Sequence, residues 1–120
     1  QPPELYLVYP QGNYIRPADS KPYLVIGEVK YGKPILDRVI TPKVSIGDAS
    51  RCALISMDST LKSDLTVGPP IDFAVIKKDE IKIASLKCLN MNDPEFSKVC
   101  NQWSQGIFKI FDSFQRFDWE

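Results

Sequence analysis

Chemistry in this chain has to come from carboxylates, amines or hydroxyls, because its 120 residues include no histidine. The chain therefore cannot form a Ser-His or Cys-His dyad or a histidine zinc motif. The polar group of most interest is the segment 63–66, Ser-Asp-Leu-Thr, which stands just before the break Gly-Pro-Pro at 68–70. On its residue types alone, Asp64 fits an aspartate that ends a helix, and Ser63 and Thr66 fit turn and capping groups.

The cysteines do not suggest a nucleophile. Cys52, Cys88 and Cys100 are odd in number, widely spaced and without a Cys-x-x-Cys pair. This pattern favours reduced thiols in a cytoplasmic protein. Because Cys52 and Cys100 fall on the apolar stripes of expected helices, we expect both to be small buried hydrophobes.

Composition excludes several classes of partner. The 43% of hydrophobic residues suffices for one domain with a core. Fifteen basic and fifteen acidic residues cancel without a block of like charge, so we expect no nucleic-acid partner. No apolar run approaches the roughly 20 residues that cross a bilayer, and residues 1–4 lack the order of a signal peptide. We expect a soluble protein without membrane contact, cofactor or metal.

The first forty residues predict strands and one short helix. Residues 5–9 are apolar on both alternating faces, which indicates a strand covered on both sides in a layered sandwich. A turn at 10–13 and a return at 13–15 predict a hairpin. Residues 23–26 predict a further strand that ends at Gly27. A short helix is expected between about 29 and 40, beginning near Pro34.

The remainder predicts two long helices around a second hairpin. Ser45 and Asp48 have the spacing of a capping box at the start of a helix whose small and apolar stripe runs to Leu61. Strands are expected at 71–76 and 81–86, with a turn at 77–80. Asp93 predicts the cap of an amphipathic helix of about twenty residues that packs on a protein layer rather than on a membrane surface.

The order of these elements resembles that of the second half of a proteasome β-type subunit. Residues 5–14 are similar to the hairpin of that superfamily, and residues 63–68 to its Arg-Asp-x-x-Ser-Gly motif. Within the superfamily, the strings at 27–38, 57–60 and 67–72 resemble Anbu, the bacterial proteasome-related family. The similarity is good from about residue 5 to residue 88 and looser along the last helix.

The resemblance implies an α+β fold with antiparallel strands and three helices. These would form part of the four-layer αββα sandwich of an N-terminal-nucleophile hydrolase, with residues 1–120 as the C-terminal half of a single domain whose N-terminal half is absent. Such enzymes hydrolyse peptide bonds with an N-terminal threonine or similar residue, whose α-amino group, of pKa about 7.7 to 8.0, serves as the base. The nucleophile, its neighbouring aspartate and the catalytic lysine would lie outside this chain, since Gln1 has no nucleophilic hydroxyl or thiol.

Only supporting catalytic residues carry over from the family. Asp64 matches the aspartate that forms hydrogen bonds near the N-terminal amine, where a carboxylate would orient the ammonium group. Val67 stands in place of the family's neighbouring serine, so Thr66 is the nearest hydroxyl. Glu28 stands where the second supporting serine would be.

The expected partners are the N-terminal half of the same protein, further copies of the chain and a peptide substrate. The strands at 5–9 and 71–76 carry apolar residues on both faces. Leaving this surface exposed to water would be unfavourable in free energy, which favours such association. An alternative is a non-catalytic scaffold or ring subunit of the same fold. A third hypothesis is a small α+β interaction module that docks through Trp103, Phe108 and Trp119.

Overall fold

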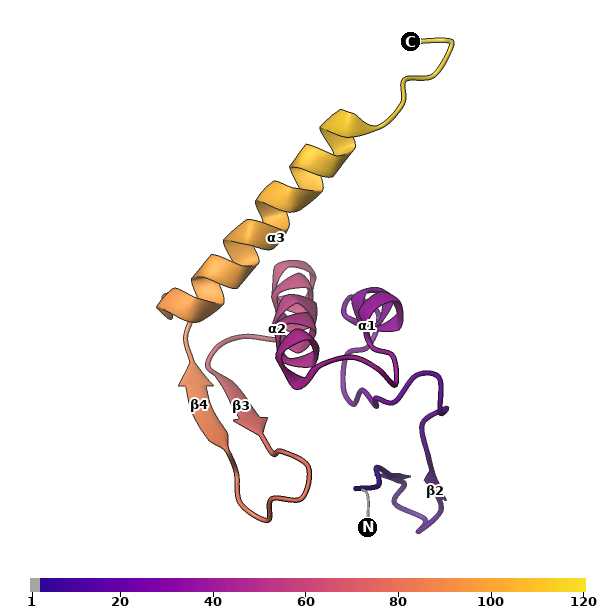
Figure 1. Cartoon of the computed structure of the whole chain (residues 1–120), viewed down its shortest axis with the longest axis vertical. Coiled ribbons are helices and arrows are strands. Elements are labelled where there is room, and N and C mark those ends of the chain that lie inside the picture. The colour runs from indigo at the N-terminus through magenta and orange to yellow at the C-terminus, as the bar shows by residue number, and fades with distance from the viewer. Residues whose placement is uncertain (1–2) are drawn as a thin grey trace.

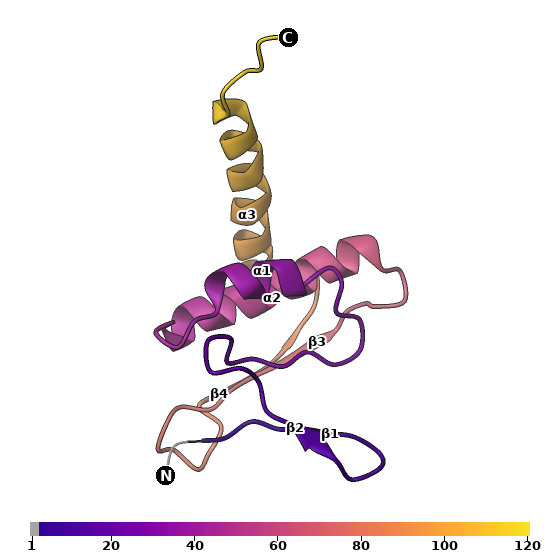
Figure 2. The ribbon, with the colours of Figure 1, turned by 90° about the vertical axis from the view of Figure 1, so that its right-hand side faces the viewer.

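The computed structural model describes residues 3–120 and shows an α+β fold, as expected. Gln1 lies outside the described residues. Within these residues, three helices accompany two separate antiparallel sheets of two strands each. Helices α1 and α2 lie side by side over the strand segments, and α3 extends away from both (Figures 1 and 2). The described residues form fewer layers than the four-layer sandwich implied by the resemblance.

The first hairpin is present but short. Strand β1 (Leu7–Val8) pairs antiparallel with β2 (Tyr14–Ile15). In the turn, the N–H of Gly12 donates to the carbonyl of Tyr9 at 2.9 Å, and glycine accommodates the φ of 90°. The predicted hairpin is confirmed, although only two residues of the segment 5–9 enter the ladder.

The expected strand at 23–26 is not formed. The segment belongs to neither sheet among residues 3–120, and the Ile26 side chain is 78% exposed. A strand exists only through hydrogen bonds to a neighbouring strand, and no described strand lies beside this segment to supply them. The hydropathy of residues 23–26 therefore predicted an extended backbone, but it did not show whether another strand pairs with it.

Helices α1 (Lys33–Val39) and α2 (Ile46–Ser63) begin where the sequence predicts. They approach closely at Gly32, where an added Cβ would lie 3.1 Å from the Cβ of Ser56. The Ser45 hydroxyl accepts the N–H of Asp48 at 3.0 Å, which is one half of the predicted capping box. The reciprocal bond is not made, because the Asp48 carboxylate pairs with Arg51 at 3.0 Å.

The second hairpin has a longer loop than expected. Strand β3 (Ile71–Val75) pairs with β4 (Ser85–Leu89), so the predicted return at 81–86 was placed too early. The N–H of Glu80 does bond to the carbonyl of Lys77 at 3.1 Å, but the chain rejoins the ladder only at residue 85. Core packing explains this register, because it places Leu89 opposite Ile71 in the buried cluster.

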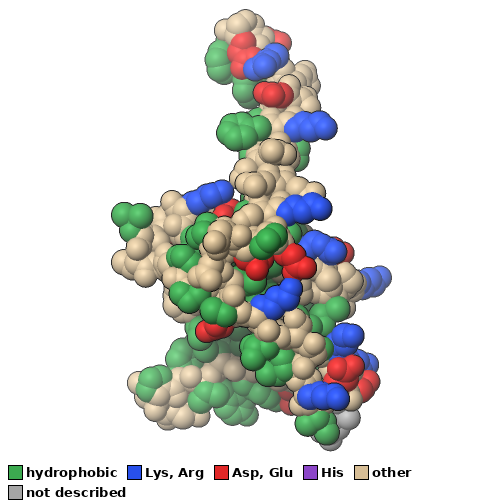
Figure 3. Space-filling view, turned by 90° about the vertical axis from the view of Figure 1, so that its left-hand side faces the viewer, with side chains coloured by type: hydrophobic (Ala, Val, Ile, Leu, Met, Phe, Trp, Pro, Cys, Tyr) green, Lys and Arg blue, Asp and Glu red, His purple; other side chains and the backbone are tan. Residues whose placement is uncertain are grey.

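Helix α3 (Pro94–Ser113) follows the predicted cap, with the Asp93 carboxylate accepting the N–H of Phe96 at 3.0 Å. Only its first turns are packed. The buried apolar cluster consists of Ile71, Leu89, Phe96 and Cys100. Further along the predicted apolar stripe, Phe111 and Phe114 are 63% and 55% exposed. Figure 3 shows hydrophobic side chains exposed on this projecting end. Of the residues proposed for a docking module, Phe108 and Trp119 are exposed and Trp103 is half-buried.

No helix in the described part of the chain has the length and hydrophobicity needed to cross a membrane.

Candidate functional site

Asp64 stands at the C-terminal end of α2, as its residue type predicted. It is the C-cap, and its N–H donates to the carbonyl of Thr60 at 2.8 Å. The chain then turns so that Thr66 donates twice to the Asp64 Oδ1 atom, from its N–H at 2.9 Å and from its hydroxyl at 2.6 Å. The structure therefore brings Asp64 and Thr66 together in one local turn.

These two bonds favour the charged form of the carboxyl group. The Thr66 hydroxyl, and then the Thr66 N–H, lower the pKa of Asp64 below its ordinary value, while slight desolvation opposes them. Asp64, which is an anion at neutral pH in any case, therefore keeps its charge to lower pH. Both bonds end on Oδ1, which leaves Oδ2 available to a cationic group brought up by another segment.

Glu28 lies in a different turn. It follows Gly27, whose φ is 79°, and its Oε1 atom accepts the N–H of Lys30 at 3.0 Å. Among residues 3–120, no hydrogen bond or ion pair joins Glu28 to Asp64 or Thr66. The structure thus unites two of the three predicted site residues and leaves the third apart.

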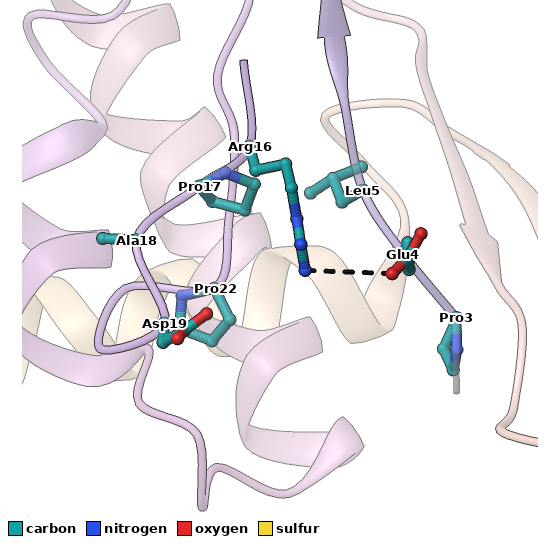
Figure 4. Close-up of a pocket in the computed structure, with 8 residues that line it drawn as sticks. All are labelled: Pro3, Glu4, Leu5, Arg16, Pro17, Ala18, Asp19 and Pro22. Atoms are coloured by element: carbon teal, nitrogen blue, oxygen red, sulfur yellow. Dashed lines mark ion pairs between the residues drawn. The ribbon is translucent and has the colours of Figure 1, made fainter. Parts of the chain in front are cut away.

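None of the three predicted residues lines the principal cavities of the described chain. One cavity, of about 390 Å³, lies between residues 3–5 and the segment 16–22 (Figure 4). In it, Arg16 points toward Glu4 with an ion-pair distance of 3.9 Å. Prolines form much of its wall, and its lining contains no serine, threonine, cysteine or lysine.

A second cavity, of about 440 Å³, is mainly apolar. It lies between the unpaired segment 22–26 and the facing sides of α1 and α2. Two hydroxyls belong to its lining residues, those of Ser56 and Tyr23. The first donates to the carbonyl of Ala53 at 2.7 Å and the second to the Asp37 carboxylate, so both are already used. This cavity is suited to hydrophobic packing rather than to catalysis.

The cysteines behave as predicted. Cys52 and Cys100 are buried and Cys88 is exposed. Burial, followed by the nearby Asp58 carboxylate, raises the pKa of the Cys100 thiol to about 11, and burial also raises the pKa of Cys52. Neither thiol is a nucleophile at neutral pH. Within residues 3–120, no group of cysteine and acidic side chains is arranged to hold a metal ion.

Sequence reasoning missed one polar cluster, which consists of Lys21, Tyr23, Lys33 and Asp37. The Lys33 ammonium lies 2.9 Å from the Asp37 carboxylate, and the Tyr23 hydroxyl and the Lys21 ammonium also donate to Asp37. The spacing of four residues between Lys33 and Asp37 is a visible signal for a helical ion pair. The contacts from residues 21 and 23 depend on tertiary structure and have no local signal.

Solved structures share both the fold and much of the sequence of this chain. An Anbu mutant from Hyphomicrobium sp. strain MC1 is 40% identical with a TM-score of 0.92, over 98% of this chain and 52% of that one. Anbu from Yersinia bercovieri is 38% identical with a TM-score of 0.93, over 98% of this chain and 51% of that one. The chain is related to the Anbu proteins.

The Anbu relatives are longer than this chain. Anbu from Pseudomonas aeruginosa, 41% identical with a TM-score of 0.90, is matched over 98% of this chain and 48% of its own length. The chain therefore spans about half the length of these relatives. The Yersinia protein is described as an ancestral beta-subunit, and the Pseudomonas protein as forming a helical assembly. No protein-family model and no curated protein matches the chain.

Proposed function

We propose that this chain is the C-terminal part of a proteasome-like N-terminal-nucleophile peptidase whose attacking residue lies outside these 120 residues. The observation that carries the proposal is the match to Anbu proteins at about 40% identity along 98% of the chain, which supports a proteasome-related subunit. The absence of histidine from the sequence is compatible with this chemistry, because the base is the α-amino group of the nucleophile.

The surface of the chain supports a missing partner. A compact monomer of 13.6 kDa should expose about 6,600 Å² by the usual scaling with mass, whereas this chain exposes 9680 Å². The difference of roughly 3,000 Å² on this one partner is comparable to one side of a large obligate interface. We propose that the N-terminal half of the protein covers the unpaired segment 22–26 and the apolar cavity beside it, completing the four-layer sandwich.

Asp64 would act on the nucleophile's amine. Its anionic carboxylate, held on one oxygen by Thr66, can accept an N–H from an ammonium group through Oδ2. It would orient the amine that takes the proton from the attacking hydroxyl and later returns it to the leaving amine of the peptide. Glu28 would support the site from its separate turn, as a second carboxylate rather than as a contact of Asp64.

Copies of the chain would also bind one another. The projecting end of α3 exposes Phe108, Phe111 and Phe114, an apolar stripe that nothing in the described chain covers. A related protein forms a helical assembly. We propose that this stripe contacts a second copy in a homo-oligomer, and that the protein cleaves peptides in the cytoplasm.

The second candidate function is a non-catalytic scaffold or ring subunit. It is favoured by the position of Asp64, which lines none of the described cavities, and by Val67 in place of the family's serine hydroxyl. The same surface argument holds for it, since a scaffold subunit also needs partners. The docking-module hypothesis is weaker, because Trp103 is half-buried within the chain.

The two functions are separated by the effect of Asp64 on catalysis. In the full-length protein, Asp64→Asn should lower kcat/KM for a fluorogenic peptide by at least about tenfold. Because a carboxylate raises the pKa of a neighbouring ammonium group, its removal should also move the acid limb of the pH profile to lower pH.

The control is Asp48→Asn, which removes a carboxylate from an exposed pair with Arg51 on the same helix. It should leave both the rate and the profile unchanged. A wild-type protein that cleaves no peptide would support the scaffold function. An active protein in which Asp64→Asn changes nothing would show that Asp64 lies away from the amine.

A further inference from the structure

We propose that Asp37 is a positioning residue that fixes the extended segment 22–26, and with it the Gly27–Glu28 turn, onto helix α1. The effect on the segment follows from the contacts of Asp37 alone. The effect on catalysis rests on the function proposed above, in which Glu28 supports the site.

The Asp37 side chain joins the segment to the helix. Its Oδ1 atom accepts the hydroxyl of Tyr23, from the segment, and its two oxygens lie 3.1 and 2.9 Å from the Lys33 ammonium, from the first turn of α1. Lys33 Nζ also lies 3.3 Å from the Tyr23 hydroxyl and 5.8 Å from the centre of its ring. The Asp37 carboxylate, the Tyr23 side chain and the Lys33 ammonium group therefore each contact the other two. Hydrogen bonds to an ionised group are stronger than bonds between neutral groups.

The main chain of Asp37 makes a second attachment. Helix α1 has seven residues, and its last carbonyls have no N–H partner within the helix. The Lys21 ammonium donates to the Asp37 carbonyl, at the end of the helix where a cation is favoured. Residues on both sides of Pro22 are thus tied to one residue of α1.

The segment depends on such contacts because no strand of residues 3–120 pairs with it. Within the described chain its backbone makes one short-range bond, from the Tyr23 N–H to the Lys21 carbonyl at 2.8 Å. The chain then bends at Gly27, whose φ is 79°, immediately before Glu28. The start of that turn is consequently set by where Asp37 holds Tyr23.

The ties are present throughout the neutral range of pH. The Tyr23 hydroxyl, followed by Lys33, lowers the pKa of Asp37, so the carboxylate is ionised well below neutrality. Burial, followed by the bond to Asp37, raises the pKa of Tyr23, and bonds to Asp37 and Tyr23 raise that of Lys33. At neutral pH the tyrosine therefore keeps its proton and the lysine its charge. A proton-transfer role near neutral pH is therefore not expected of Asp37.

Hydrogen exchange on the full-length protein tests the attachment directly. In Asp37→Ala, amides 23–28 should exchange about tenfold faster than in the wild type, which corresponds to the loss of one charge-assisted bond. Tyr23→Phe, which keeps the Lys33–Asp37 pair, should give part of this increase and serves if the alanine variant fails to fold. Asp48→Ala, which removes an exposed ion pair on α2, should leave these amides unchanged. Wild-type exchange in both Asp37→Ala and Tyr23→Phe would overturn the proposal.

Kinetics on the same proteins tests the positioning role. Asp37→Ala should lower kcat/KM several-fold without moving the acid limb of the pH profile, in contrast to Asp64→Asn. A shifted limb in Asp37→Ala would show a direct role in proton handling and overturn positioning. If the wild type cleaves no peptide, the proposed peptidase fails, and the exchange experiment still decides the attachment.

Discussion

At the residue scale, the Asp64–Thr66 turn shows how a short stretch of chain can hold a carboxylate ready for an outside partner. A single residue, Thr66, supplies both donors to one oxygen of Asp64. The carboxylate is therefore oriented before any other segment approaches. Such preorganisation is what a residue that orients a catalytic amine requires.

Replacement of the Thr66 hydroxyl should be visible as a change in the titration of Asp64. Thr66→Val removes the side-chain bond and keeps the N–H bond, so the pKa of Asp64 should rise toward the ordinary value of about 3.9. Carboxyl carbon NMR shifts followed against pH would measure it. The matched control is Thr41→Val, because the Thr41 hydroxyl oxygen accepts from the N–H of Lys43 and contacts no carboxylate.

The same variant has a defined effect on stability. A carboxyl whose pKa is lower when folded stabilises the fold above its unfolded pKa of about 3.9, and this contribution is lost as the pH falls through the folded value. Thr66→Val should therefore lose stability relative to wild type at pH 6 and less at pH 2. An Asp64 titration identical to that of the wild type would contradict the role given to the hydroxyl.

The site could be predicted from sequence only where its contacts are local. Asp64 and Thr66 lie two residues apart, and their turn follows from residue types next to a helix end. The bond from Tyr23 to Asp37 spans fourteen residues and exists only because the segment 22–26 lies along α1. Glu28 was assigned by resemblance, and its one described bond, to Lys30, is as local as that of Asp64.

At the element scale, side-chain caps define where the two long helices begin. Ser45 accepts from the N–H of Asp48, and Asp93 from that of Phe96, both at 3.0 Å. These starts were predictable because a cap involves residues three apart. The pairing of β4 and the lack of pairing at 23–26 were not, since both depend on which residues from distant parts of the chain share a core.

Loss of the cap of α2 should destabilise the protein by an amount typical of such caps. Ser45→Ala leaves the N–H of Asp48 without its partner and should lower the free energy of unfolding by about 1 kcal/mol. Urea unfolding followed by circular dichroism would measure it. Ser50→Ala is the control, because its hydroxyl donates to the Ile46 carbonyl within the helix and makes no cap. An equal loss from both variants would contradict the capping role.

At the scale of the whole molecule, the chain is more extended than a closed domain. Its radius of gyration is 16.9 Å, against about 14 Å expected for 120 residues in a compact domain. The buried apolar cluster is confined to the junction of β3, β4 and α3 with α2. Periodicity predicted the three helices and the two hairpins, but the strand that it predicted at 23–26 is not formed. The extended shape has no signal in periodicity, because it depends on which apolar faces the described chain leaves uncovered.

Association should follow from those faces. The 120-residue chain alone should self-associate in size-exclusion chromatography with light scattering, and a well-behaved monomer would contradict this.

In the full-length protein, the double change Phe111→Asp with Phe114→Asp should reduce the assembled mass, because it places charge on the exposed stripe of α3. Gln105→Asp, a change at another exposed position of α3, should keep the wild-type mass.

The central claim is that this chain supports a reaction whose attacking group lies elsewhere in the protein. A β-lactone probe that acylates N-terminal nucleophiles, followed by peptide mapping of the labelled full-length protein, tests it most directly. We predict one adduct, on the N-terminal residue of the mature protein and outside residues 1–120. An adduct on any residue of this chain would contradict the claim.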